Sequence, residues 1–324
     1  MLKRYQAIYI FVFLFCVVLL FLPHGASAEV QVEATLPPAT ECAASRVTRI
    51  LVMGVDRSAR LADSMMLVTV NEEQNSVSVV QIPRDTYANY TQRSYKKLNG
   101  LLREKGEKGA KEFLSRAMGV PLDYFIVLDL DCLDSLVDAV GGVDLEIEQD
   151  LYYSDPSQGL EIALPKGPHH LSGAQAEQFV RYRSGYSNAD LGRLDAQKLF
   201  LRALAKRCNS ITAPELFRIV GCTLTRLQTD MDLPTVIRMV GLFGKFDAEE
   251  IRMETLSGRA VQGSSGAWYY SLNKEGCVRT VNQLLCPNLE MNQDRFDPDG
   301  VFDRRDHPDF HRIYSCPEDQ LPPG

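Results

Sequence analysis

The sequence has no excess of positive charge. Its 35 lysine and arginine residues stand against 42 aspartate and glutamate residues, which gives a formal net charge of -7 and a pI near 5.4. Nucleic-acid binders usually carry a basic excess on one face. The charge balance therefore argues against nucleic acid as a partner. It leaves room for a local basic pocket that holds an anionic ligand.

The sequence also lacks the patterns of a zinc site and of a repeat protein. It contains no CxxC pair, no cluster of histidines and no internal repeat. Among its eight cysteines, Cys132 begins an apolar helix face, where a small core residue is expected. The spacings of Cys208 with Cys222 and of Cys277 with Cys286 permit local disulfide bridges, but they do not assign partners.

A basic flank and an apolar run open the chain. Lys3 and Arg4 precede an apolar segment from Ala7 to Leu22, a pattern that directs export with the N-terminus inside. The run is shorter than the ~20 residues that span a bilayer comfortably, and residues 26–28 resemble a small-residue cleavage site. A cleaved signal peptide and a retained membrane anchor therefore both fit. In either case the body of the protein is expected outside the cytoplasm.

The chain is predicted to have four parts. Residues 1–28 form the anchor or signal peptide, and residues 29–46 form a linker without periodicity. Residues 47–286 form the folded domain, and residues 287–324, rich in Asp, Asn and Pro, form a C-terminal tail. A chain of 324 residues that is 45% hydrophobic is long enough for one large domain or two small ones.

Apolar runs and helical periodicity alternate through most of the chain, which predicts an α/β layered domain. Strands are predicted at 49–55, 65–70, 76–82, 124–130 and 143–147, with weaker patterns at 251–256 and 269–270. Helices are predicted at 109–118, 133–140, 172–183 and 273–285, and further helices begin at Asp190, Thr212 and Asp232. Ser172 and Gln175 fit a capping box, and the turn between the second and third strands predicts a hairpin.

Polar residues stand at the ends of the first three predicted strands. Asp56 follows the first strand, Arg60 and Asp63 precede the second, and Arg84-Asp85 follows the third. Ligands in open α/β sheets bind just beyond strand ends. Two carboxylates such as Asp56 and Asp63 suit a hard divalent cation, because magnesium prefers one or two carboxylates together with phosphate oxygens.

A second cluster consists of Arg181, Arg183, Asp190, Arg193 and Gln197. The last three are spaced by three and four, so they share one helix face, and the N-terminus of that helix is a natural anion site. Arg181 and Arg183 converge only if their helix ends near Arg183 or their side chains bend round. Guanidinium groups suit phosphate because they offer a planar fork of donors. Together the two clusters describe a metal–pyrophosphate site.

Each of these residues also has an ordinary structural interpretation. Arg84-Asp85 fits a turn with a surface ion pair, Asp190 fits a helix cap, and residues 56–63 fit a polar loop. His169-His170 has no visible partner and fits a loop pair rather than a metal site. The two clusters taken together are stronger evidence for a functional site than any one of these residues.

Several motifs occur in a fixed order between Ile50 and Arg207. They are residues 54–57, 62–68, 81–87, 97–99, 136–144, 171–176, 180–183 and 190–193 with Gln197. In this order they resemble the LytR–CpsA–Psr family. Gln81 stands where that family usually has Ser, and Ala196 stands where it often has Arg.

The resemblance implies a three-layer α/β/α domain with a mixed central sheet, preceded by the single N-terminal hydrophobic segment. It implies an apolar groove for a polyprenyl-phosphate lipid at the extracytoplasmic face of the cell membrane. The implied reaction moves an anionic glycopolymer, of teichoic-acid or capsular type, from an undecaprenyl-pyrophosphate carrier to peptidoglycan. A polyprenyl-pyrophosphate hydrolase and a non-catalytic lipid-binding envelope regulator are the alternatives.

The resemblance also implies roles for individual residues. Asp56 and Asp63 would bind Mg²⁺, with Mn²⁺ as the alternative ion. The residues that would hold the pyrophosphate are Arg60, Arg84, Lys97, Arg181, Arg183, Arg193 and Gln197. The residues that would take part in catalysis are Asp63, Arg84, Arg181, Arg183 and Asp190. We hypothesise that an aspartate near the mouth of the site, of which Asp63 is one candidate, accepts the proton of the attacking hydroxyl.

Overall fold

The computed structural model describes most of the chain from Val47 onwards. It describes residues 47–56, 60–91, 96–156, 160–186, 190–208, 211, 227–232, 234–235, 238–239, 250–286 and 294–304. The predicted membrane segment, the linker and the predicted helix from Thr212 lie outside these residues, so the predicted domain boundaries stay predictions. None of the helices in the described part is both long and apolar enough to cross a membrane.

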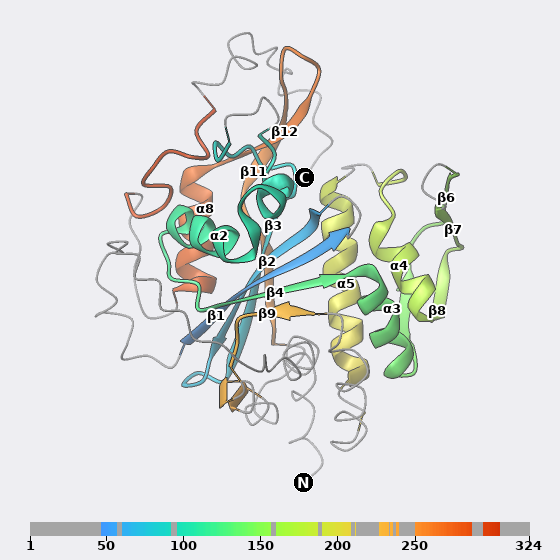
Figure 1. The fold of residues 1–324 in the computed structure, drawn as a ribbon. Helices are drawn as coiled ribbons and strands as arrows, with labels where there is room; N and C mark the ends of the chain where they lie inside the picture. Colours follow the sequence, from blue (N-terminus) through green and yellow to red (C-terminus); the bar gives the residue numbers. More distant parts are fainter. Residues whose placement is uncertain are drawn as a thin grey trace.

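A six-stranded sheet lies at the centre of the domain, in the order β10-β3-β2-β1-β4-β9 (Figure 1). The pairs β1–β2, β2–β3 and β4–β9 are antiparallel, whereas β1–β4 and β3–β10 are parallel. The predicted mixed central sheet is therefore confirmed. Its strands are β1 (Val47–Asp56), β2 (Leu61–Asn71), β3 (Ser76–Ile82), β4 (Tyr124–Asp129), β9 (Gln228–Thr229) and β10 (Arg252–Thr255).

The predicted hairpin of β2 and β3 is present, but β2 begins earlier than its apolar run suggested. It starts at Leu61 rather than at Met65, because the polar residues before the run still pair with the end of β1. Ser64 lies opposite Gly54, and Ala62 lies opposite Val55 across a register shift. Asp63 therefore belongs to a strand of the central sheet and not to a loop.

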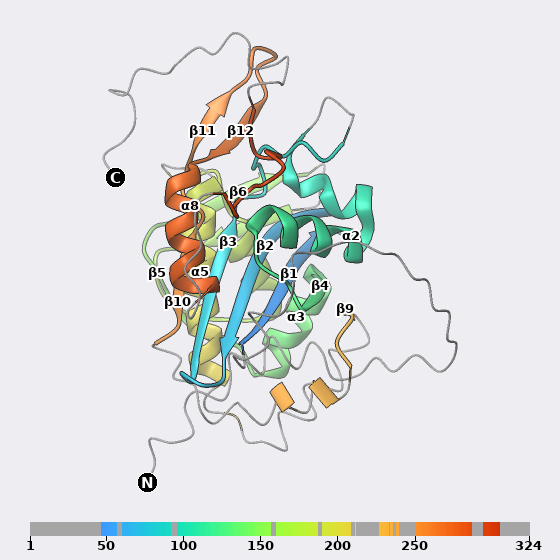
Figure 2. The same cartoon turned by 90° about the vertical axis from the view of Figure 1, so that its left-hand side faces the viewer.

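Helices cover both faces of the sheet (Figures 1 and 2). Alternate residues of β1 enter two separate cores, Leu51 and Met53 on one side and Ile50 and Val52 on the other. All four are at most 2% exposed, as expected for strands buried on both faces. The first face carries α2 (Leu101–Met118) and α8 (Lys274–Thr280), and the second carries α3 (Leu130–Ala139), α4 (Gly173–Arg181) and α5 (Asp190–Cys208).

Two of the helices differ most from their predicted extent. α2 begins at Leu101, just after the short helix η3 (Leu98–Gly100), rather than at Gly109. The non-helical φ of 68° at Gly106 interrupts it, which explains why only its second half had a clear helical period. The predicted helix at 273–285 is divided into α8 and the π-helix η6 (Val281–Leu285).

Three cysteines, Cys132, Cys277 and Cys286, are core residues. Cys132 is 2% exposed, as predicted. The Cys277 thiol is free and donates a hydrogen bond to the carbonyl oxygen of Ser257 at 3.3 Å. The local bridge to Cys286 that the spacing permitted is therefore absent. Burial raises the pKa of the Cys277 thiol to about 12, so it is unreactive at neutral pH.

Three small antiparallel pairs complete the domain. Of the four strands near α4, only β5 was predicted from the sequence. The strands β11 and β12 extend from the body of the domain as a hairpin (Figure 2). Contrary to the loop interpretation, His169-His170 lies in a strand, β8. The pairs are β5 (Val143–Ile147) with β8 (Gly167–Leu171), β6 (Leu151–Asp155) with β7 (Leu160–Leu164), and β11 (Gly258–Gln262) with β12 (Trp268–Leu272).

His170 has partners on both ring nitrogens. Asp144 lies directly opposite it on β5, and its Oδ1 is 2.7 Å from His170 Nδ1. His170 Nε2 lies 2.9 Å from the carbonyl oxygen of Gly141. The hydrogen bond to Asp144 is the largest reason that the His170 pKa is raised above 6.5.

We expect Asp144→Asn to lower the His170 pKa, measured by NMR titration of the imidazole C–H resonances. Because folding raises this pKa, its contribution to stability is present below pH 6.5 and is lost as the pH rises through the folded-state value. Glu146→Gln, two residues along β5, is the matched control and should leave the titration unchanged. An equal response to both substitutions would contradict the specific pairing with Asp144.

The start of α4 explains the Leu-Ser-Gly-Ala-Gln motif. The Ser172 side chain accepts a hydrogen bond from the Gln175 backbone N–H, and the predicted capping box is present. Gly173 donates its N–H to Asp138 Oδ1 of α3 at 2.7 Å. A Cβ on Gly173 would lie 2.3 Å from the carbonyl oxygen of Asp134. A side chain at this position is therefore excluded by the close approach of α3 and α4.

We expect Gly173→Ala to lower the free energy of unfolding by about 1–3 kcal/mol, because backbone atoms of α3 have to move. Chemical denaturation monitored by circular dichroism measures this. Ala174→Ser adds one heavy atom at the next, exposed position and should change stability by less than about 0.5 kcal/mol. Equal stability of the two variants would show that the helices separate easily.

Candidate functional site

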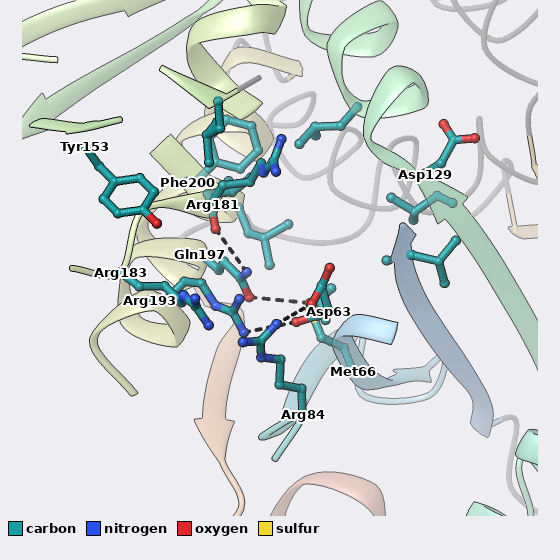
Figure 3. A pocket seen from close by; sticks show the side chains of 18 of the residues that line it. Asp63, Met66, Arg84, Asp129, Tyr153, Arg181, Arg183, Arg193, Gln197 and Phe200 are labelled. Carbon is teal, nitrogen blue, oxygen red and sulfur yellow. Dashed lines mark hydrogen bonds and ion pairs between the residues drawn. The ribbon is translucent and has the colours of Figure 1, made fainter. Parts of the chain in front are cut away.

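A cavity of about 270 Å³ opens at one end of the central sheet. The carboxyl ends of β1, β3 and β4 meet there, together with the start of β2. The opposite wall comes from α4, α5 and the segment between them, and the β6–β7 hairpin closes one side (Figure 3). This is the place where open α/β sheets usually bind ligands.

An ion pair joins β2 to the end of β3 at the cavity. Arg84 Nη1 donates to Asp63 Oδ1, and the two side chains are 18% and 44% exposed, respectively. Arg193 of α5 donates to the backbone carbonyl oxygen of Asp63 at 3.2 Å. The residues predicted beside separate strands therefore meet at one point, and a guanidinium from α5 joins them (Figure 3).

The predicted face of α5 points to the cavity. Arg193 and Gln197 both line it, and Phe200 follows one turn later. Ser64 Oγ donates to Gln197 Oε1 at 3.4 Å, and Gln197 Nε2 donates to the carbonyl oxygen of Val180 at 3.4 Å. Gln197 therefore bridges β2 and α4. Asp190 is the first residue of α5, but its side chain lies outside the described residues.

Arg181 and Arg183 reach the same cavity because α4 ends between them. Arg181 is the last residue of α4, and Tyr182 is its extended C-cap, so the helix stops two residues before the predicted limit at Arg183. Both arginines line the cavity. Arg181 Nη1 pairs with Glu177 Oε1 at 2.6 Å, whereas Arg183 is exposed. Of the two routes to convergence, the end of the helix is the one that the structure takes.

The segment after α4 is held against α5 by tyrosine packing. Tyr182 and Tyr186 form an edge-on pair with centroids 5.3 Å apart, and a Cβ on Gly192 would lie 2.4 Å from Tyr186 Cβ. Glycine in the Asp-Leu-Gly-Arg motif therefore permits this close approach. Burial raises the pKa of Tyr186 to about 12, so its hydroxyl stays protonated at neutral pH and cannot act as a base.

The interior of the cavity is apolar. Leu133 of α3 and Phe200 of α5 line it and are 8% and 2% exposed, respectively. Leu128, Val180 and Leu201 add to the same surface. The cavity thus combines an apolar interior with a group of arginines, an arrangement suited to a ligand with an apolar chain and an anionic head.

Other predicted site residues lie elsewhere, or their side chains are not described. Arg60, with φ 49°, precedes β2 and pairs with Glu107 at 2.6 Å on the exposed surface. Lys97 Nζ lies 3.1 Å from Asp85 Oδ1 and 5.9 Å from the centroid of Tyr269. Neither belongs to the cavity lining. Asp56 ends β1, next to Val55 of the lining, but its side chain lies outside the described residues.

Several lining residues were missed by the sequence interpretation. Asp129 lines the cavity at 5% exposure and caps α3 through the Cys132 backbone N–H at 2.8 Å. Its position at the end of β4 is the same signal that pointed to Asp56 and Arg84. Tyr153 and Leu160 come from the β6–β7 hairpin, which the sequence analysis did not predict.

Among the described residues, no three His, Cys, Asp or Glu side chains form a group able to hold a metal ion. The cavity does offer the half-exposed Asp63 carboxylate. Magnesium needs only one or two protein carboxylates when phosphate oxygens supply other ligands. The described carboxylate at the cavity therefore fits magnesium that arrives with a phosphorylated substrate.

Residues 25–285 match the model of the LytR_cpsA_psr family, so the chain belongs to this family, as its motifs predicted. It is 25% identical to the Bacillus subtilis transferase TagV over 250 residues, 73% of this chain and 64% of that protein. It is 29% identical to TagU of Bacillus mycoides over 259 residues, 77% of this chain and 81% of that protein. Both relatives are named polyisoprenyl-teichoic acid–peptidoglycan teichoic acid transferases.

The alignment thus spans less than two thirds of the length of TagV. The fold is similar to the crystal structure of Bacillus subtilis TagV, with a TM-score of 0.64 and 22% sequence identity. That superposition covers 78% of this chain and 98% of the TagV chain. It supports the same arrangement of the central sheet and its helices.

Gln81 connects the sheet to the wall of the cavity. It is fully buried in β3, and its Nε2 donates to the carbonyl oxygen of Leu194 in α5 at 3.2 Å. Its Oε1 accepts a hydrogen bond from Thr255 Oγ1 of β10 at 3.3 Å. The longer side chain at this position, where the family usually has Ser, therefore links three elements behind Arg193.

We expect Gln81→Ser to lower the free energy of unfolding by about 1–3 kcal/mol, because it removes two buried hydrogen bonds and leaves a void. Gln74→Ser, in the exposed turn between β2 and β3, is the matched control. Equilibrium unfolding in urea measures both. A Gln81 variant as stable as the Gln74 variant would mean that the shorter side chain, or water, satisfies these groups.

Proposed function

We propose that this protein transfers an anionic glycopolymer, of teichoic-acid or capsular-polysaccharide type, from an undecaprenyl-pyrophosphate carrier to a hydroxyl group of peptidoglycan. The proposed location is the extracytoplasmic face of the cell membrane, with the N-terminal segment as an anchor or signal peptide. One observation carries the proposal: a single cavity has an apolar interior and four arginines, Arg84, Arg181, Arg183 and Arg193. The activities named for TagV and TagU support it.

The parts of the cavity correspond to the parts of such a donor. The apolar interior around Phe200 and Leu133 is suited to the first units of a polyprenyl chain. The guanidinium groups offer paired donors to pyrophosphate oxygens. Arg193 is 4% exposed, so its charge acts in surroundings where water screens it weakly.

In the proposed reaction, an acceptor hydroxyl attacks the phosphorus that carries the glycan. A new P–O bond joins this phosphorus to the peptidoglycan oxygen. Its bond to the bridging oxygen of the pyrophosphate breaks, and polyprenyl phosphate leaves with that oxygen. The arginines stabilise negative charge on the transferring and departing phosphates, which is the main protein contribution to phosphoryl transfer. Asp63 is the proposed acceptor of the hydroxyl proton, because its carboxylate is half-exposed at the cavity.

Magnesium is the proposed cofactor, held by Asp63 and Asp56, with Mn²⁺ as an alternative that prefers the same oxygen ligands. When bound, the ion would supply positive charge to the pyrophosphate. We assign Gln197 the positioning of Arg181 through its bond to Val180, and Asp190 a place at the start of α5. Arg60 and Lys97 are proposed as pyrophosphate ligands on the family resemblance alone. In the structure they pair with Glu107 and Asp85 and do not line the cavity.

The proposed function is tested by turnover of a synthetic lipid-pyrophosphate glycan with the full-length protein in detergent, magnesium and peptidoglycan oligomers. Mass spectrometry should detect a phosphodiester between glycan and peptidoglycan. Release of free glycan phosphate in place of this product would identify a hydrolase. Tight binding of several donors without any product would identify a lipid-binding protein, and either result would contradict the transferase.

We expect the double substitution of Arg181 and Arg183 by Ala to reduce transfer at least about 100-fold, because two donors to the transferring phosphate are lost. The matched control replaces Arg116 and Arg279, which are 66% and 65% exposed outside the cavity. It removes the same charge and should keep near wild-type transfer. If both double variants transferred equally well, the assignment of the cavity arginines would be wrong.

A further inference from the structure

The β6–β7 hairpin has one face turned inward and one turned to solvent. Cross-strand partners share a face of the hairpin, and Leu151 and Leu164, paired at its base, are both 1% exposed. Tyr153 is the next inward residue of β6 and is paired with the buried Ile162. Tyr152, between Leu151 and Tyr153, belongs to the outer face and is 58% exposed. The inward face thus runs from the core to the edge of the cavity.

Tyr153 lies at the open edge of the cavity rather than in its interior. It lines the cavity but keeps 37% of its surface exposed, compared with 2% for Phe200. Arg183 and Ser184 also line the cavity and are exposed. Figure 3 shows the Tyr153 side chain extending from the hairpin on the side of the cavity where Arg181 and Arg183 lie. The arginines thus have an apolar interior on one side and an aromatic, solvated rim on the other.

This rim is held in place by its neighbours. Gln149, just before β6, donates to the carbonyl oxygen of Gly185 at 3.3 Å, which links the hairpin to the segment that carries Arg183. The backbone N–H of Ala163 in β7 donates to Gln178 Oε1 of α4 at 3.4 Å. The position of Tyr153 relative to the arginines is therefore set by contacts on both of its sides.

We propose that Tyr153 forms a saccharide subsite, in which its ring packs against the pyranose bonded to the donor pyrophosphate. This inference rests on the function proposed above. The C–H groups of a pyranose form an apolar face that fits the electron-rich face of an aromatic ring, while the sugar hydroxyls stay in contact with water at the rim. Ser184 and Arg183, which also line the cavity and are exposed, would donate hydrogen bonds to those hydroxyls.

The exposure of Tyr153 favours a sugar over the lipid as its contact. A polyprenyl chain gains most from surfaces that become fully buried, and the interior around Phe200 and Leu133 offers those. The sugar is attached to the opposite end of the pyrophosphate, so it leaves the arginines toward solvent. A half-exposed aromatic ring with a polar hydroxyl suits that part of the donor, since it presents both an apolar surface and a hydrogen-bonding group.

The test compares two probes that differ only by the sugar on the pyrophosphate: farnesyl pyrophosphate and farnesyl-pyrophosphoryl-N-acetylglucosamine. Isothermal titration calorimetry with the full-length protein in detergent gives both dissociation constants. We expect Tyr153→Ala to weaken binding of the sugar-bearing probe about tenfold and to leave farnesyl pyrophosphate within about twofold of wild type. Tyr153→Phe keeps the ring and should bind both probes like wild type.

Tyr152→Ala is the matched control, because it removes the neighbouring tyrosine on the outer face of the same strand. It should change neither constant. Equal loss of both probes in Tyr153→Ala, or no loss of either, would overturn the saccharide subsite. The proposed function would still stand in both cases, because the wild-type protein binds the lipid pyrophosphate. A loss in Tyr153→Phe as large as in Tyr153→Ala would overturn ring packing. Failure of the wild-type protein to bind either probe would instead overturn the proposed function, and the subsite with it.

Discussion

The antiparallel pairing of β1 with β2 is the constraint on which the rest of the site depends. It runs from Val47 opposite Asn71 to Asp56 opposite Leu61, with one register shift between Gly54 and Val55, and so extends well beyond the apolar run of β2. This extension makes the polar residues Asp63 and Ser64 part of the sheet. Because β3 and β4 pair with the outer edges of the same two strands, Arg84 and Asp129 reach the same end of the sheet. The sheet therefore holds Asp63 and Asp129 within its strands and places Arg84 just after β3.

A second constraint is the repulsion among arginines gathered around a small cavity. Two of them have carboxylate partners within the structure, Arg84 with Asp63 and Arg181 with Glu177. Arg193 instead donates to a backbone carbonyl oxygen. These contacts hold the guanidinium groups in place before any anion arrives, which lowers the ordering cost of binding. In the proposed function, a pyrophosphate would have to compete with Asp63 for Arg84, and this exchange would leave Asp63 available for its proposed role as a base or metal ligand.

Much of this arrangement could be predicted from the sequence because its signals are local. Strand ends followed by Asp or Arg marked β1 and β3, and the spacing of Arg193 and Gln197 marked one face of α5. The capping box at Ser172 fixed the start of α4. The predictions failed where the local pattern was missing or interrupted. The polar start of β2 had no apolar pattern, and Gly106 divided the helical period of α2. Pairing with a partner strand, which no local pattern records, decided where β2 begins.

The hairpin that carries Tyr153 shows why part of the site could not be predicted. Its two strands are short, and β6 carries a tyrosine on each face, Tyr152 outward and Tyr153 inward, so the alternation of apolar and polar residues along β6 is weak. The inward residues at the base of the hairpin are buried because it packs against α4, a contact that the sequence of the hairpin does not record. The residues proposed to bind the common part of the donor, the pyrophosphate, thus come from strand ends and helices with strong local signals. The residue that would contact the variable part, the glycan, comes from a peripheral hairpin, where sequence can change without disturbing the central sheet.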